Sequence, residues 1–146
     1  MAELAIRVAR AADLAAATSL LRAAGLPVED FSEDLIGNFL VASTGPSVVG
    51  CIGLEPLSNV GLLRSLAVDP DFRDGGVGRM LVRELEAHAS RLGINELWLL
   101  TIDADGFFSR LDYRVQERDK APAAIRRTAE FSLLCPDDAI LMKKTI

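Results

Sequence analysis

The pattern of apolar and polar positions divides the chain into short apolar runs separated by amphipathic stretches. Runs that are continuously apolar or that alternate predict strands at 4–9, 39–42, 48–54, 61–68, 96–101 and 113–115. Apolar residues spaced three and four apart predict helices at 13–24 and 77–92. Shorter helical segments are expected at 32–36, 104–111 and 122–127, and two further strands near 129–134 and 139–143.

Local signals support the boundaries of the two longer helices. Asp13 is expected to cap the first helix, and Gly25 and Gly93 follow the two helices as stop residues. The turn at 43–46 joins two strands into a hairpin. The helix 77–92 connects two strands as a crossover, which predicts that those strands pair in parallel beneath it. The pattern therefore favours a mixed α/β domain.

Composition narrows the class of protein. A chain of 146 residues is long enough for one core and too short for two ordinary domains. Its net charge of -5 disfavours nucleic acid as a partner, because Lys and Arg drive phosphate binding. Charges interrupt every apolar run before the roughly 18 residues of a membrane span, so no membrane partner is expected. The first residues resemble a strand rather than a secretory signal. The chain has only two cysteines, Cys51 and Cys135, which is too few for a disulfide scaffold. A cytoplasmic location is therefore expected.

A glycine-rich turn follows the strand 61–68 and opens the helix 77–92. It reads Asp69-Pro70-Asp71-Phe72-Arg73-Asp74-Gly75-Gly76-Val77-Gly78. Glycines allow close backbone approach, and a helix N-terminus offers N–H groups and a positive dipole end to an anion. The turn therefore predicts a site for a phosphate-bearing cofactor, with an ordinary strand-to-helix loop as the alternative. The absence of Gly-Lys-Ser/Thr argues against a nucleoside triphosphate loop.

The segment 73–78, which follows Leu66-Ala67-Val68-Asp69-Pro70, resembles the glycine motif of the GNAT superfamily of acetyl-CoA-dependent N-acetyltransferases. The segment 107–113, Phe-Phe-Ser-Arg-Leu-Asp-Tyr, resembles the later aromatic helix and strand of that family. The resemblance covers nearly the whole chain and implies a single domain, 1–146. The implied fold is a mixed, mostly antiparallel sheet that is splayed at a β-bulge and flanked by helices. The implied reaction moves an acetyl group from acetyl-CoA to an amine by direct attack in a ternary complex, with no metal.

Three further sets of residues resemble a GNAT branch encoded beside arsenic-resistance genes: 63–68, 99–101 with 107–108, and 125–131 with 134–136. This similarity implies a small acceptor amine that is acidic or amino-acid-like, with arsenical amino acids included. GNAT domains often pair, so a homodimer is compatible with the resemblance.

The resemblance also assigns the cofactor site. It implies that acetyl-CoA contacts Leu66, Ala67, Val68, Arg73, Asp74, Gly75, Gly76, Val77, Gly78 and Arg79, with Phe107 and Phe108 as an apolar wall. The N–H of Val68 would face the thioester oxygen and stabilise the charge that develops there. Asp74 departs from the family pattern, because it brings a negative charge near the phosphates.

The proton transfers are less defined by the sequence. An amine must lose a proton before it attacks, and the candidate bases are Glu55, which is favoured, and Glu130. A solvated carboxylate is the alternative for Glu55. Phe108 stands where many relatives place a Tyr that protonates the thiolate, and Tyr113 fits a packing position. The thiolate would then be protonated by water or Ser109, or would leave without an acid. The second functional interpretation is a weakly active domain that binds an acyl-CoA or a metabolite.

The acceptor site is predicted from polar residues near the expected cleft. Arg64 interrupts an apolar strand. Turned inward, it would bind an acidic acceptor group bidentately; turned outward, it would be solvated. Ser65, Thr101 and Arg126 are the other residues expected to border the acceptor.

Overall fold

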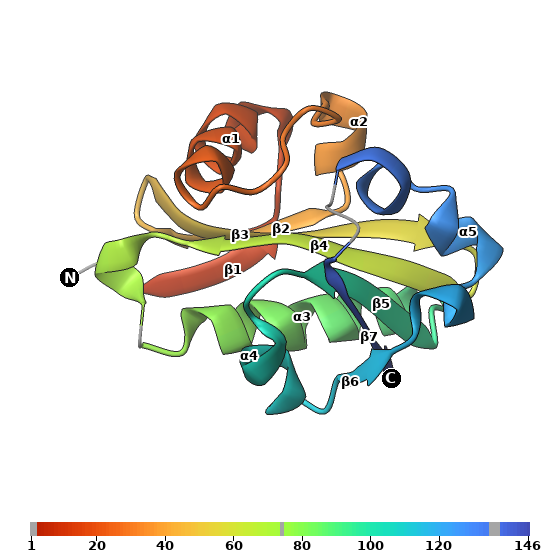
Figure 1. The fold of residues 1–146 in the computed structure, drawn as a ribbon. Coiled ribbons are helices and arrows are strands. Elements are labelled where there is room, and N and C mark those ends of the chain that lie inside the picture. Colours follow the sequence, from red (N-terminus) through yellow and green to blue (C-terminus); the bar gives the residue numbers. More distant parts are fainter. Residues whose placement is uncertain (1–2, 74, 135–137) are drawn as a thin grey trace.

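The computed structural model describes residues 3–73, 75–134 and 138–146, and within these residues a single seven-stranded sheet runs through the molecule (Figure 1). The strand order is β1-β2-β3-β4-β5-β7-β6, and every neighbouring pair is antiparallel except β4 and β5. The bounds are β1 Leu4–Val8, β2 Phe39–Thr44, β3 Ser47–Leu57, β4 Val60–Val68, β5 Glu96–Thr101, β6 Arg114–Gln116 and β7 Ile140–Thr145. The expected mixed, mostly antiparallel sheet is confirmed.

Helices cover both faces of this sheet. The α-helices are α1 Leu14–Ala23, α2 Glu33–Ile36, α3 Val77–Arg91, α4 Asp105–Ser109 and α5 Ala123–Arg126. In Figure 1, α1 and α2 lie above the sheet, and α3 and α4 lie below it. The lower core is formed where the buried Leu81 and Leu85 of α3 pack with strand residues such as Leu54 and Leu97. None of the helices that the described residues form combines the length and apolar character needed to cross a membrane.

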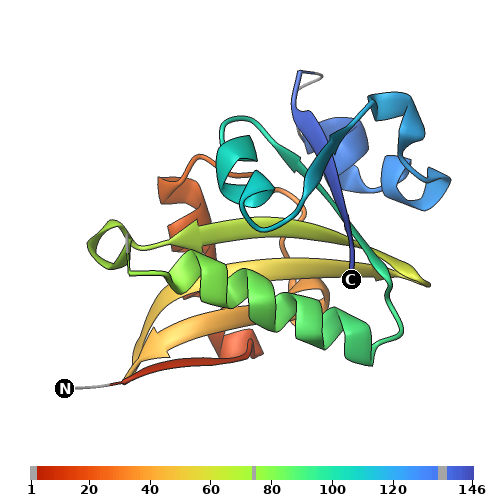
Figure 2. The ribbon, with the colours of Figure 1, turned by 90° about the horizontal axis from the view of Figure 1, so that it is seen from below.

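The sheet splits between β4 and β5. Gly53 pairs with Arg64, whereas Cys51 pairs with Ala67, so β4 carries one residue more than β3 over this stretch. Ser65 takes up the extra length with a φ of 59°, which is left-handed backbone. β4 and β5 pair only through Val60–Leu62 and Glu96–Trp98. Beyond that point the two strands diverge, as Figure 2 shows from below, and the expected β-bulge splay is confirmed.

The strand expected at 129–134 is wrong. Glu130–Leu134 forms a π-helical turn instead, on the same side of the sheet as α1 and α2. Thr128 explains the difference, because its hydroxyl donates to the carbonyl of Ile125 and accepts from the N–H of Phe131, and its carbonyl accepts from Ser132. These local hydrogen bonds satisfy groups that a strand would offer to a neighbour. The strand expected at 139–143 is confirmed as β7.

Asp13 occupies the expected N-cap position of the first helix, but its side chain does not cap that helix. α1 begins at Leu14 without a side-chain cap hydrogen bond. The Asp13 carboxylate instead accepts from both terminal nitrogens of Arg7, at 2.7 and 3.0 Å, and from the N–H of Arg10 at 2.8 Å. The hydrogen bond from Arg7 lowers the pKa of Asp13 to about 2. Asp13 therefore ties the end of β1 to the turn before α1.

Candidate active site

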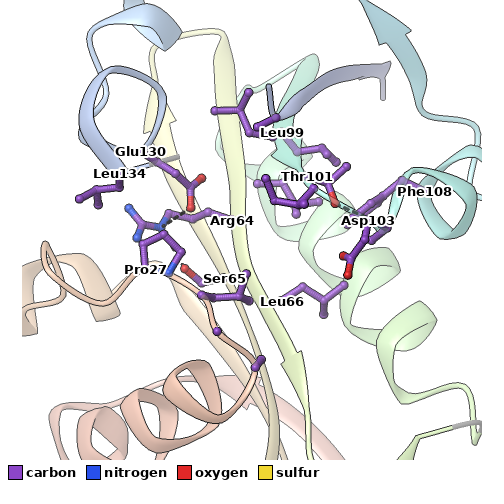
Figure 3. Close-up of a pocket in the computed structure, with 18 of the residues that line it drawn as sticks. Pro27, Arg64, Ser65, Leu66, Leu99, Thr101, Asp103, Phe108, Glu130 and Leu134 are labelled. Atoms are coloured by element: carbon purple, nitrogen blue, oxygen red, sulfur yellow. Dashed lines mark hydrogen bonds and ion pairs between the residues drawn. The ribbon is translucent and has the colours of Figure 1, made fainter. Parts of the chain in front are cut away.

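A cavity of about 680 Å³ opens where β4 and β5 diverge. Its walls come from β4, from the end of β5 with the loop that follows it, from the loop after α1, and from Phe108 and Glu130. Figure 3 shows that Arg64, Glu130 and Pro27 lie to one side of β4, whereas Leu66 and Phe108 lie to the other. The cavity thus joins groups from both sides of the split strand.

On one side of this cavity, β4 presents backbone groups that do not pair with β3. The N–H of Asp69 donates to the carbonyl of Val49 on β3 at 2.8 Å. Successive residues of an extended strand direct their N–H and C=O groups to opposite sides, so those of Val68 point away from β3 into the gap. Arg73 Nε donates to the Val68 carbonyl at 3.2 Å, which agrees with this direction. Leu66 shares the direction of Val68, whereas Ala67 faces β3 and packs its side chain under α1.

The N-terminus of α3 lies beyond the end of β4. Gly76 precedes the helix with a φ of 82°, and its carbonyl accepts the hydrogen bond of Met80 N–H. The N–H groups of Val77, Gly78 and Arg79 therefore precede the first intrahelical donor. A Cβ on Gly76 would contact nothing within 4 Å, so this turn is open. Asp74, which the sequence placed in the same site, lies outside the described residues.

Of the two phenylalanines and two arginines expected near the cofactor, Phe108 and Arg73 line the cavity, whereas Phe107 and Arg79 do not. Phe107 packs against the start of α3, where a Cβ on Gly78 would lie 3.4 Å from its ring. Phe108 is buried and lines the cavity, with its ring 5.1 Å from that of Phe107. Arg73 lines the cavity as well, while Arg79 is exposed on α3.

On the other side of β4, Arg64 lies among three carboxyl groups. Its Nη1 is 2.5 Å from Asp30 and 2.9 Å from Glu55, and its Nη2 is 2.8 Å from the second oxygen of Asp30. Its Nε donates to Ser65 Oγ at 3.0 Å and lies 3.8 Å from Glu130. Arg64 is only 2% exposed, so the inward alternative is the one observed. Its charge, however, is already matched by carboxyl groups of this chain.

These three carboxyl groups come from separate parts of the fold. Asp30 lies in the loop between α1 and α2, Glu55 on β3, and Glu130 in the π-helical turn. We define them, together with Arg64, as the Arg64 cluster. No local motif marks the pairing of Asp30 with an arginine 34 positions later in the sequence.

Glu130 is the least satisfied member of the Arg64 cluster. It is 4% exposed, and among the described residues its Oε2 has no hydrogen-bond partner. Burial raises the pKa of Glu130 to about 7, the nearby Glu55 and Asp30 add to the rise, and Arg64 opposes it. A carboxyl group that changes protonation near neutral pH on a cavity wall is a candidate for proton transfer.

Of the other site residues proposed from the sequence, some line this cavity and some do not. Thr101 and Ser65 line it, and Thr101 Oγ1 accepts from the N–H of Ala104 at 3.0 Å. Glu55 is not one of the lining residues, and Arg126 is exposed on the last turn of α5, away from the cavity wall. Within the described residues, no group of three or more His, Cys, Asp or Glu side chains is arranged to hold a metal ion.

Tyr113 and the cysteines have structural surroundings. Tyr113 is buried beside Phe108, and its hydroxyl donates to Glu86 at 2.9 Å, which confirms the expected packing position. Cys51 is buried in β3, and burial raises the pKa of its thiol to about 12. Cys135 lies outside the described residues.

The model of the Acetyltransferase (GNAT) family matches residues 9–114, which is more than half of the chain. This chain belongs to the GNAT acetyltransferase family. An uncharacterised N-acetyltransferase of Chlorobaculum tepidum is 33% identical across 99% of this chain and 98% of its own length. An amino-acid acetyltransferase of Azotobacter vinelandii is 34% identical over 61% of this chain, which spans only 21% of that longer protein. The family and these relatives identify the chain as an N-acetyltransferase.

Solved structures agree on the fold. The N-acetylglutamate synthase of Neisseria gonorrhoeae, complexed with coenzyme A and N-acetyl-glutamate, superposes with a TM-score of 0.85 at 22% identity. That match covers 99% of this chain and 35% of the synthase. A Mycobacterium tuberculosis protein complexed with CoA superposes with a TM-score of 0.82 at 24% identity, over 97% of this chain and 99% of that protein. At this identity the comparison establishes the GNAT fold.

Proposed function

We propose that this GNAT protein transfers the acetyl group of acetyl-CoA to the amine of a small, amino-acid-like acceptor by direct attack in a ternary complex. The observation that carries the proposal is a cavity in the β4–β5 split, which has backbone groups of β4 that do not pair with β3 on one side and the Arg64 cluster on the other. The first side fits a thioester, and the second fits an amine that must lose a proton.

The cofactor would lie along β4 and across the N-terminus of α3. The pantetheine arm would pair with the outward backbone groups of Leu66 and Val68 as an added strand. The N–H groups at 77–79 and the helix dipole would hold the pyrophosphate. The N–H of Val68 would then face the thioester oxygen, where negative charge develops during attack. When bound, acetyl-CoA supplies the activated acetyl group.

The acceptor class rests on the relatives and on the resemblance of the sequence. Amino-acid acetyltransferases are among the relatives, and the synthase superposed above was solved with an acetylated amino acid. The resemblance to the arsenic-resistance branch adds arsenical amino acids to the acceptors that we propose. Departure of the thiolate needs no strong acid, because thiol pKa values lie near 8.5. Phe108 in place of Tyr is therefore compatible with turnover.

A panel of acceptors tests the proposal. Release of CoA thiol from acetyl-CoA would be measured with glutamate, glutamine, their phosphinic and arsenical analogues, and a simple alkylamine. We expect at least one amino-acid-like acceptor to raise the rate about tenfold or more above background hydrolysis, since positioning and base catalysis both contribute. If calorimetry shows CoA binding and no acceptor exceeds the background, the protein is a binding module and the proposed transfer is wrong.

Replacing Gly76 by alanine should weaken coenzyme A binding by about tenfold or more. A left-handed φ costs an L-residue about 1–2 kcal/mol, so the turn would relax and move the N–H groups that are proposed to hold the pyrophosphate. Calorimetric titration with coenzyme A measures the change in Kd.

Gly93 provides a matched control for this substitution. It follows the same helix at its other end with a φ of 83°, and a Cβ there would also contact nothing within 4 Å. Gly93→Ala should lower stability by a similar amount and leave the Kd for coenzyme A unchanged. Equal effects of both substitutions on binding would contradict the proposed position of the pyrophosphate.

A further inference from the structure

We infer that Glu130 accepts the proton of the acceptor's ammonium group, and that Arg64, held by Asp30 and Glu55, is a positioning residue for Glu130. This inference rests on the proposed acetyl transfer and names the group that starts it. It also specifies the acceptor as an amine that enters in its ammonium form, with that cation directed toward the Arg64 cluster.

Hydrogen bonding separates Glu130 from Glu55. Glu55 accepts directly from Arg64 Nη1 at 2.9 Å, and its side chain is not part of the cavity wall. Glu130 is part of that wall, its nearest approach to the guanidinium is 3.8 Å, and its Oε2 is unpaired among the described residues. A buried acceptor atom without a donor is costly unless a ligand supplies one. An ammonium group supplies such a donor.

The same contacts argue against the role that the sequence suggested for Arg64. All three of its guanidinium nitrogens already donate, to Asp30, Glu55 and Ser65. To bind Arg64 bidentately, an acidic acceptor group would have to displace one of these partners. One guanidinium facing three carboxyl groups also makes this side of the cavity a better environment for a cation than for an anion. The structure therefore directs the amine of the acceptor, rather than a carboxylate, to Arg64 and its partners.

The proton transfer balances without another reactant. The ammonium gives one proton to the Glu130 carboxylate, and the neutral amine attacks the thioester carbon. The carbon–sulfur bond of the resulting intermediate then breaks, and its electron pair leaves with the sulfur as thiolate. The thiolate takes the second proton from nitrogen, which gives the amide and free CoA. Glu130 returns its proton to water.

The surroundings of Glu130 suit this transfer. The charged groups that act on it from the described residues are Arg64 on β4, Glu55 on β3 and Asp30 in the α1–α2 loop. Burial and the two carboxylates raise the pKa of Glu130 to about 7, while Arg64 keeps it from rising further. A base is most effective when its pKa lies near the working pH.

The decisive experiment compares pH profiles of kcat/KM for the wild type, Glu130→Gln and Glu55→Gln, using the acceptor found in the panel. The wild type should show an acid limb near pH 7. Glu130→Gln should lower kcat/KM about 100-fold or more and remove that limb. Glu55→Gln should retain most turnover and move the limb to lower pH, because a negative charge that raises the pKa of Glu130 is gone. The opposite result, with the large loss in Glu55→Gln, would make Glu55 the base and overturn the inference.

Two controls separate a catalytic role from a structural one. All variants should bind coenzyme A with the wild-type Kd, and Glu84→Gln, at an exposed position of α3, should leave the profile unchanged. An acceptor analogue whose amine is already neutral at pH 7, such as a fluorinated amine, needs no base. With it, the defect of Glu130→Gln should shrink below tenfold, and a defect of undiminished size would contradict the inference. Wild-type protein that binds coenzyme A but acetylates no acceptor would instead overturn the proposed function.

Discussion

Replacing Arg64 by methionine is expected to lower the free energy of unfolding by about 3–5 kcal/mol at pH 7. Arg64 is 2% exposed, and its removal leaves Asp30, Glu55 and Glu130 close together without their shared cation. Methionine fills a similar volume, so the loss should come from the unmatched carboxyl groups rather than from a cavity. Urea unfolding monitored by circular dichroism measures it.

The pair between Arg7 and Asp13 is the control for this prediction. It has the same bidentate form, but the Arg7 side chain is 33% exposed. Because Arg7 lies partly in solvent and Asp13 keeps the N–H of Arg10 as a donor, Arg7→Met should lower the free energy of unfolding by less, about 1–2 kcal/mol. Equal losses in the two variants would show that burial of the Arg64 cluster does not determine its contribution.

The Arg64 cluster also shows why the sequence could not assign the acceptor side. Along an uninterrupted strand, alternate residues share a face, and this rule would place Arg64 and Leu66 together. Ser65 adopts left-handed backbone between them and breaks the alternation. Figure 3 accordingly shows Arg64 and Leu66 pointing to opposite sides of β4. The partner of Arg64, Asp30, is brought to it only by the path of the loop after α1.

The cofactor side was predictable because its signals are local. The apolar strand, the glycine turn and the amphipathic helix adjoin one another at 60–91, and the structure keeps their order and nearly their bounds. The segment 129–134 shows the opposite case. Its alternation resembles that of a strand, but the hydrogen bonds of Thr128 produce a π-helical turn that brings Glu130 to Arg64. A pattern of apolar residues does not record such side-chain contacts.

Glu130→Gln is expected to stabilise the protein relative to the wild type as the pH rises from 4 to 8. The pKa of Glu130 is about 7 in the folded protein, against an ordinary value of 4.5. A raised pKa means that the folded state holds the proton more tightly than the unfolded chain does. Protonated Glu130 therefore contributes fully to the free energy of unfolding of the wild type below pH 4.5, and this contribution is lost as the pH rises through 7. Because glutamine does not titrate, the free energy of unfolding of Glu130→Gln should exceed that of the wild type by about 3 kcal/mol at pH 8.

Urea unfolding of both proteins at pH 4, 6 and 8 measures this difference, with Glu84→Gln as the control for loss of charge at an exposed position. The two curves should coincide near pH 4 and separate steadily above it. Curves that stay parallel over this range would mean that Glu130 is as well solvated in the fold as in the unfolded chain. If Glu130→Gln is more stable but loses base catalysis, glutamine serves the fold better than glutamate at this buried position. Such a result would indicate that Glu130 is retained for its role in the reaction rather than for stability.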